Sequence, residues 1–106
     1  MNATNLHARL DARREPIAAL CRRHHVRRLD LFGSAASGRD QAGSDYDFLV
    51  EFEPLPPESY AEAYFGLLEG LQALLDAPVD LVVERAIRNP YFRQAVEAQR
   101  EAVYAS

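Results

Sequence analysis

The run from Asp45 to Phe52 limits more strongly than any other segment how this chain can fold. It reads Asp-Tyr-Asp-Phe-Leu-Val-Glu-Phe, so two acidic residues flank an aromatic one before an apolar centre. This pattern predicts a strand with a buried middle, and residues two apart on a strand project to the same face. Asp45 and Asp47 are therefore expected to present paired carboxylates on one face, with Tyr46 pointing away.

Apolar spacing and turn residues predict the other elements. The first is a helix over 5–24, which Pro16 either begins afresh or bends. Strands over 26–32 and 45–52, a helix over 59–76 and a strand over 78–83 follow. The last is a helix from Asn89-Pro90 that carries Phe92, Ala95, Val96 and Val103. Helices and strands mixed in this order predict an α/β (α+β) fold with a small mixed β-sheet flanked by helices.

Composition narrows the class of protein. At 106 residues, with 48% hydrophobic residues and a net charge of −4, the chain predicts one globular domain over residues 1–106. No apolar stretch approaches the roughly 20 residues of a membrane span, and no secretory signal precedes the first helix, so we expect a cytoplasmic protein without membrane contact. The negative net charge disfavours a protein whose main task is to coat nucleic acid.

The acidic residues of the strands carry the predicted chemistry. Mg²⁺ prefers oxygen ligands and commonly takes one or two carboxylates together with substrate phosphates, which an Asp45-x-Asp47 pair can supply. Asp80, inside the strand predicted over 78–83, would add a third carboxylate if that strand is a neighbour. Alone, an Asp-x-Asp sequence is weak support for a metal site, because it is common on exposed strand ends.

The turn after the first predicted strand is a second candidate. Gly33 would let backbone amides approach an anion closely, and the Ser34 hydroxyl can donate a hydrogen bond to a phosphate. The simpler alternative is that Ser34 caps a helix and Gly33 only turns the chain.

Taken together, the two features resemble a known family. Gly33-Ser34 followed after ten residues by Asp45-x-Asp47 is similar to the signature of the polymerase-β-like nucleotidyltransferase superfamily, and the chain resembles its smallest branch, the minimal nucleotidyltransferase (MNT) proteins. The similar segments are the strand before Gly33, the run from Ser44 to Phe52, Val79-Asp80-Leu81-Val82, and the C-terminal residues 101–105.

This resemblance implies roles for particular residues. Gly33 and Ser34 would hold the nucleoside triphosphate, while Asp45 and Asp47 bind two Mg²⁺ ions and Asp80 completes the metal site. Many members have Arg where this chain has Ser37, and Arg39 is the candidate to replace it as a phosphate contact.

The resemblance also implies a biological role. MNT proteins are typically antitoxins paired with a helical HEPN toxin, so it predicts an enzyme that transfers AMP from ATP to a toxin tyrosine. The alternative is an idle antitoxin that neutralises by binding alone. An arginine-rich nucleic-acid binder is a third and weaker hypothesis, and the oligomeric state, homo or hetero, stays open.

Other residues have simpler interpretations. Tyr60, Tyr64 and Tyr91 are interpreted as core or interface aromatics, and the alternative for Tyr91-Phe92 is the lining of a nucleotide base pocket. Glu51 is expected on the Asp47 face but away from the metal. Cys21 is interpreted as a core residue.

Overall fold

A four-stranded sheet forms the centre of the described part of the protein. The computed structural model describes residues 3–33 and 45–106. The strands are β1 (Val26–Phe32), β2 (Tyr46–Phe52), β3 (Val79–Val83) and β4 (Glu101–Ala105), in the spatial order β3-β2-β1-β4. Strand β1 is antiparallel to β2 and β4, whereas β2 and β3 are parallel. The sheet is therefore mixed, as the sequence predicts.

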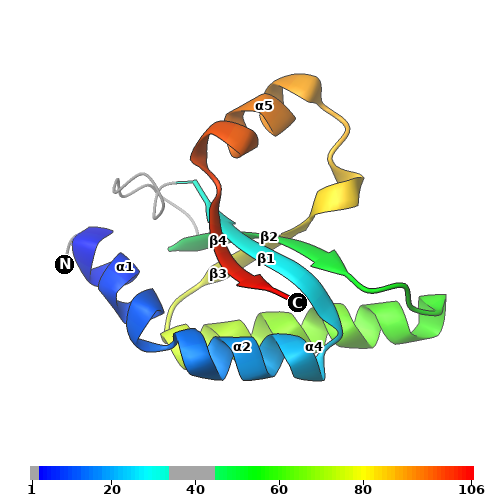
Figure 1. Ribbon diagram of the computed structural model, residues 1–106, viewed down its shortest axis with the longest axis horizontal. Coiled ribbons are helices and arrows are strands. Elements are labelled where there is room, and N and C mark those ends of the chain that lie inside the picture. Colours follow the sequence, from blue (N-terminus) through cyan, green and yellow to red (C-terminus); the bar gives the residue numbers. More distant parts are fainter. Residues whose placement is uncertain (1–2, 34–44) are drawn as a thin grey trace.

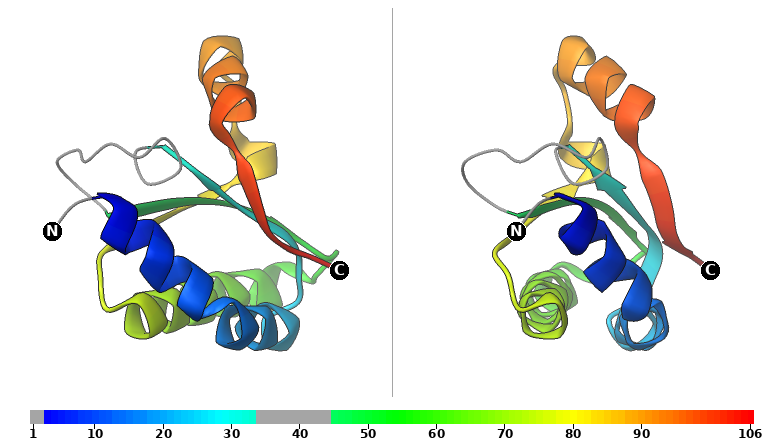
Figure 2. Two further views of the ribbon diagram at one scale, coloured as in Figure 1. Left: turned by 60° about the vertical axis from the view of Figure 1, so that its left-hand side comes forward. Right: turned by 90° about the vertical axis from the view of Figure 1, so that its left-hand side faces the viewer.

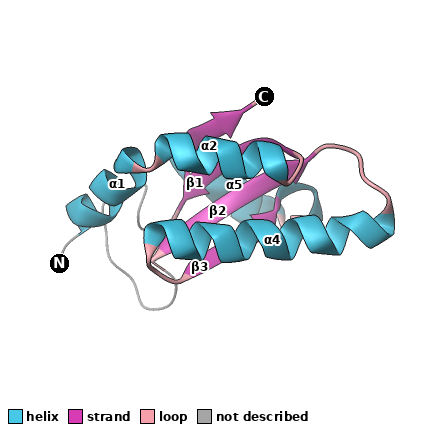
Figure 3. Ribbon diagram, turned by 90° about the horizontal axis from the view of Figure 1, so that it is seen from below, coloured by secondary structure: helices cyan, strands magenta, loops and turns pink. Residues whose placement is uncertain are grey.

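Helices cover the two faces of the sheet unequally (Figures 1 and 2). Helices α1 (Ala3–Ala12), α2 (Arg14–Arg23) and α4 (Pro57–Leu75) lie on one face, and α5 (Pro90–Gln99) lies on the other, after the short 3₁₀ helix η1 (Glu84–Ala86). Seen from below, α2 and α4 run side by side under the strands (Figure 3). Among the described residues, none of these helices has the length and apolar character needed to cross a membrane.

The main core lies between the sheet and the three helices. Tyr46, Phe48 and Val50 alternate along β2, are fully buried and belong to this core. The hydroxyl of Tyr46 donates a hydrogen bond of 2.6 Å to the carbonyl oxygen of Leu6 in α1. Tyr46 thus points away from the face that carries Asp47, because neighbouring strand residues project to opposite faces.

A smaller cluster lies under α5 on the opposite face. Phe32, Leu49 and Val96 are its buried members, and Val82 and Ile87 pack against them. A single helix on this face covers less of the sheet than three helices do. Asp47, Leu49 and Glu51 of β2 share this face. Leu49 in the middle is buried, whereas Asp47 and Glu51 on either side of it are accessible to solvent.

The N-terminal helix is divided in two, so Pro16 belongs to a fresh helix, although as its third residue and not its first. Helix α1 ends at Ala12, and α2 begins at Arg14 after Arg13, whose φ of −115° and ψ of 17° are not helical. Pro16 falls in the first turn of α2, where a backbone N–H has no intrahelical acceptor and its absence costs nothing.

The prediction that the last helix reaches Val103 is wrong. Helix α5 ends at Gln99, Arg100 adopts an extended conformation with φ −71° and ψ 141°, and β4 then pairs with β1. The physical reason is tertiary: the Arg100 guanidinium reaches the fully buried carboxylate of Asp30 on β1, with 2.6 Å between Nε and Oδ2. Such a contact, 70 residues apart in sequence, outweighs local helical spacing.

Candidate active site

Asp47 and Asp80 are neighbours across two parallel strands. In the register of β2 and β3, Asp47 pairs with Asp80, and in the register of β1 and β2 it pairs with Phe32. Residues paired in this way project to the same face, and adjacent strands lie about 4.8 Å apart. Phe32, Asp47 and Asp80 therefore form one row across the sheet, here called the carboxylate row, on the face that carries α5.

Exposure differs along this row. Phe32 is buried, Asp47 is half-buried and Asp80, on the edge strand β3, is exposed. The carboxylate of Asp80 can therefore meet a molecule that arrives from solvent, while the Asp47 carboxylate lies farther into the sheet.

Asp45 lies just before β2 and is tied to the residue that precedes β3. The backbone N–H of Asp45 donates to the carbonyl oxygen of Pro78 over 3.1 Å, and that of Tyr46 donates to the same oxygen over 3.3 Å. These bonds hold the beginnings of the two parallel strands together. Together with the register that pairs Asp47 with Asp80 near the start of both strands, they bring all three predicted carboxylates to the same end of the β2–β3 pair. Asp45 itself is half-buried.

Gly33 lies directly against Asp47. Its φ is +79°, and a Cβ atom built on it would lie 2.4 Å from Oδ2 and 3.2 Å from Cγ of Asp47. Both the backbone conformation and the lack of space disfavour a side chain here, because the Asp47 carboxylate would have to move to admit it. The turn after β1 thus brings bare backbone against the Asp47 carboxylate, and the predicted approach of a phosphate to Gly33 stays a prediction.

Two of the predicted phosphate contacts, Ser34 and Arg39, lie outside the described residues, in the segment 34–44. Ser37, the position where many members of the family have Arg, lies in the same segment. Their roles stay predictions from the sequence.

The two carboxylates of the row, Asp47 and Asp80, have the oxygen donors that a hard cation prefers, but they do not by themselves surround an ion. Among residues 3–33 and 45–106, no group of three or more His, Cys, Asp or Glu side chains is arranged to hold a metal ion. The metal role of Asp45, Asp47 and Asp80 therefore stays a prediction. Magnesium does not need such a cage, because it commonly binds one or two carboxylates and takes its other ligands from water and phosphate oxygens. The side-by-side pair Asp47 and Asp80 has the required donor chemistry.

Tyr64 supports the edge strand beside Asp80, which the sequence pattern did not reveal. Its hydroxyl donates a 2.6 Å hydrogen bond to the carbonyl oxygen of Leu81. Burial, followed by the nearby Asp80 carboxylate, raises the pKa of Tyr64. Helix α4 thus fixes the backbone one residue after Asp80.

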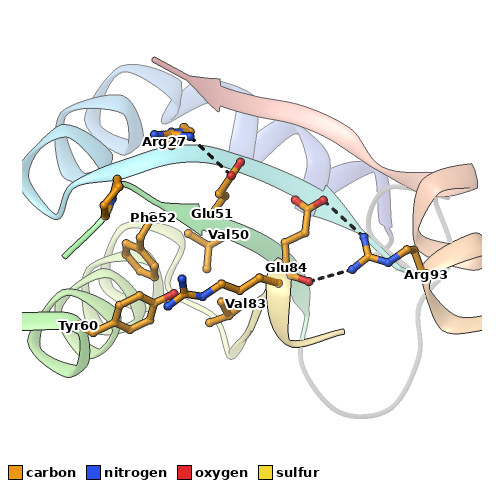
Figure 4. Close-up of a pocket in the computed structure, with 10 residues that line it drawn as sticks. Arg27, Val50, Glu51, Phe52, Tyr60, Val83, Glu84 and Arg93 are labelled. Carbon is orange, nitrogen blue, oxygen red and sulfur yellow. Dashed lines mark hydrogen bonds and ion pairs between the residues drawn. The ribbon is translucent and has the colours of Figure 1, made fainter. Parts of the chain in front are cut away.

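A pocket of about 430 Å³ lies at the other end of the same two strands (Figure 4). Within it, the Arg85 guanidinium lies 4.8 Å from the ring centroid of Tyr60, and Glu84 and Arg93 form an ion pair at 3.8 Å. The residues around it are Arg27, Val50, Glu51, Phe52, Pro54, Tyr60, Val83, Glu84, Arg85 and Arg93. This pocket contains none of the predicted catalytic residues. Glu51, on the Asp47 face, lies here and approaches Arg27 at 3.9 Å, away from the carboxylate row as expected.

Comparison with known proteins gives a consistent result. Residues 14–103 match the family model of the nucleotidyltransferase domain. The chain is 35% identical over 82 residues to the protein adenylyltransferase MntA of Thermococcus cleftensis, a match that covers 77% of each protein.

Solved structures share the fold. One assigned to the minimal nucleotidyltransferases has a TM-score of 0.71 and 35% identity, and the match covers 95% of both chains. A crystal structure of a toxin–antitoxin with AMP-PNP has a TM-score of 0.62 and 27% identity, over 88% of this chain and 73% of that one. The present chain belongs to the nucleotidyltransferase domain family, in its minimal nucleotidyltransferase branch.

Proposed function

We propose that this protein is a Mg²⁺-dependent protein adenylyltransferase that acts as an antitoxin by transferring AMP from ATP to a tyrosine of a cognate helical HEPN-type toxin. The observation that carries the proposal is the register pair of Asp47 and Asp80, with Gly33 pressed against Asp47. Similarity to the adenylyltransferase MntA and to a toxin–antitoxin structure with AMP-PNP supports the nucleotide and the partner. Because ATP is abundant in the cytoplasm, the proposed reaction takes place there.

Three carboxylates would hold the metal. Asp45 and Asp47 would bind two Mg²⁺ ions and Asp80 would complete the site, with phosphate oxygens as further ligands. When bound, these ions supply charge stabilisation for the triphosphate and for the pentavalent transition state. Gly33 and Ser34 would receive the triphosphate, because the turn after β1 brings backbone close to Asp47.

The proposed reaction is a single in-line displacement. The phenolic oxygen of the acceptor tyrosine forms a bond to the α-phosphorus, and the bond from that phosphorus to the oxygen shared with the β-phosphate breaks. Pyrophosphate leaves with that electron pair. Asp80 would bind the metal nearest the acceptor hydroxyl and help to activate it by taking the phenolic proton. Its exposure on edge strand β3, where a side chain of a partner protein can approach, supports this role.

Mass spectrometry of the partner tests the proposal. A candidate helical HEPN-type toxin is incubated with this protein, ATP and Mg²⁺, and its intact mass is measured. We expect a gain of one or more AMP groups with the parent and none with Asp47→Asn or Asp80→Asn. Each variant is first checked by circular dichroism, and loss of transfer in a folded variant assigns the chemistry to the carboxylate row.

A matched control is Glu51→Gln, which removes a carboxylate from the same sheet face but from the far end of β2. It should transfer AMP as the parent does. If the parent forms a stable complex with the toxin and adds no mass, the transferase proposal is wrong and the antitoxin neutralises by binding alone.

A further inference from the structure

Helix α5 begins with a firmly fixed first turn. The Asn89 side-chain oxygen Oδ1 accepts hydrogen bonds from the backbone N–H groups of Tyr91 at 2.9 Å and Phe92 at 3.3 Å. Pro90 occupies the first helical turn, where it needs no acceptor for an N–H. The direction in which the first aromatic side chains leave α5 is therefore well determined.

The two aromatic residues of this turn have different surroundings. The ring of Phe92 packs edge-to-face on Phe32, with 6.0 Å between centroids and 79° between planes. Phe92 is still 40% exposed, whereas Phe32 beneath it is 8% exposed. Tyr91 is 80% exposed and borders a shallow hollow with Gln94 and Glu97 of the same helix.

Phe92 thereby extends the carboxylate row. Phe32 is the register partner of Asp47, which is the partner of Asp80, so an exposed aromatic ring, a buried ring and two carboxylates follow one another on one sheet face. In Figure 1, α5 lies above the sheet on this face, opposite α2 and α4. The exposed ring of Phe92 thus contacts Phe32, which lies on the strand next to Asp47.

We propose that Phe92 stacks on the base of the nucleoside triphosphate, an inference that rests on the proposed function. Such a ligand has a charged phosphate chain at one end and a flat aromatic base at the other. At one side, the carboxylates of the row would bind the Mg²⁺ ions that carry the phosphates. At the other side, the exposed ring of Phe92 can face the base. Stacking accepts any base, because every base has a π-face.

A role in packing alone does not account for the exposed part of this ring. Phe32 already packs with Val96 and contacts the ring of Phe92, and it is only 8% exposed. Phe65 provides the comparison: it is 57% exposed, packs edge-to-face on Tyr64 at 5.1 Å and belongs to α4, on the other side of the sheet. Of these two exposed rings, Phe92 alone lies on the sheet face that carries the carboxylates.

The test compares a ligand that has a base with one that lacks it. Affinities for MgATP and for Mg²⁺ with inorganic tripolyphosphate are measured by calorimetry for the parent, Phe92→Ala, Phe92→Leu and the control Phe65→Ala. We expect Phe92→Ala to weaken ATP binding by about 5- to 150-fold, with a smaller loss in Phe92→Leu. Tripolyphosphate affinity should be unchanged in both, and Phe65→Ala should behave as the parent. GTP should lose as much affinity as ATP.

Other results would overturn the inference and separate it from the proposed function. Equal losses for ATP and tripolyphosphate in Phe92→Leu would show a general disturbance of the site. Unchanged ATP affinity in Phe92→Ala, with a raised KM for the toxin, would instead assign the ring to the acceptor. Either result leaves the transferase proposal standing, whereas a parent that binds neither ligand would remove both.

Discussion

A Cβ atom on Gly33 would lie 2.4 Å from Oδ2 of Asp47. This relationship joins the turn after β1 to the carboxylate that pairs with Asp80, on the sheet face that carries the carboxylate row. The residue is needed for two separate reasons, a positive φ of +79° and the lack of room for a side chain.

We therefore expect Gly33→Ala to reduce both stability and AMP transfer. An alanine at positive φ costs about 1–2 kcal/mol in unfolding free energy, and the Asp47 carboxylate must also move to admit the methyl group. Urea unfolding and the toxin mass assay measure the two effects. Gly70→Ala, whose Cβ would meet the flexible side chain of Leu20 at 2.6 Å and which lies on α4, is the control for a crowded glycine remote from the site. Full AMP transfer in Gly33→Ala would contradict the close approach inferred here.

Arg100 and Asp30 form a buried ion pair that should contribute strongly to stability. Asp30 is fully buried, its Oδ2 accepts from Arg100 and lies 3.1 Å from Nε of Arg28, and its Oδ1 has no hydrogen-bond partner in the described structure. Removing Arg100 would leave a buried charge with only a half-exposed partner. We expect Arg100→Met to destabilise the fold by about 3 kcal/mol.

The double variant Asp30→Leu/Arg100→Met should recover at least half of that loss, because an apolar pair no longer leaves a charge inside the protein. Urea unfolding of the two single variants and the double variant gives the coupling. A double variant as unstable as the sum of the singles would show that the pair is not coupled.

The pair His7 and Glu101 predicts how stability depends on pH. Their side chains meet at 3.0 Å, and the hydrogen bond to Glu101 raises the pKa of His7 above its ordinary 6.5. A raised folded-state pKa contributes stability that is complete below pH 6.5 and is lost as pH rises through the folded value. The parent should therefore lose stability relative to His7→Gln between about pH 6 and pH 8.

Comparison with His7→Gln isolates this contribution from His24, whose pKa burial lowers and whose effect has the opposite sign. The measurement is the midpoint of urea unfolding at several pH values. A difference between parent and variant that does not change with pH would show that the His7 contact carries no proton linkage.

Tyr64→Phe should remove a single hydrogen bond without altering the core. The lost bond to the Leu81 carbonyl, 2.6 Å long, is expected to cost about 1 kcal/mol of unfolding free energy. Because that carbonyl follows Asp80 directly, AMP transfer should fall more than MgATP binding does. Tyr60→Phe, which keeps the ring beneath Arg85 at the far pocket, is the matched control. Equal activity in the two variants would mean that the hydroxyl of Tyr64 does not position β3.

The sequence by itself determined the elements whose cause is local. Two-residue alternation placed Asp47 and Tyr46 on opposite faces of β2, and helical spacing found α4, predicted over 59–76 and observed over Pro57–Leu75. The mixed sheet, the MNT fold and Cys21 as a core residue, now seen fully buried, were also predictable. These features follow from side-chain periodicity and apolar content within one segment, which a linear sequence displays directly.

Only the tertiary structure decided which distant segments meet. The register that sets Asp47 beside Asp80, the contact of Phe92 with Phe32 and the pairing of β4 with β1 all join residues far apart in the chain. The C-terminal segment shows the reason. Residues 101–105 continue a helical pattern locally, but the burial of Arg100 on Asp30 and hydrogen bonding along β1 stabilise a strand there. Such energies depend on pairing in three dimensions, and local propensity is too weak to oppose them.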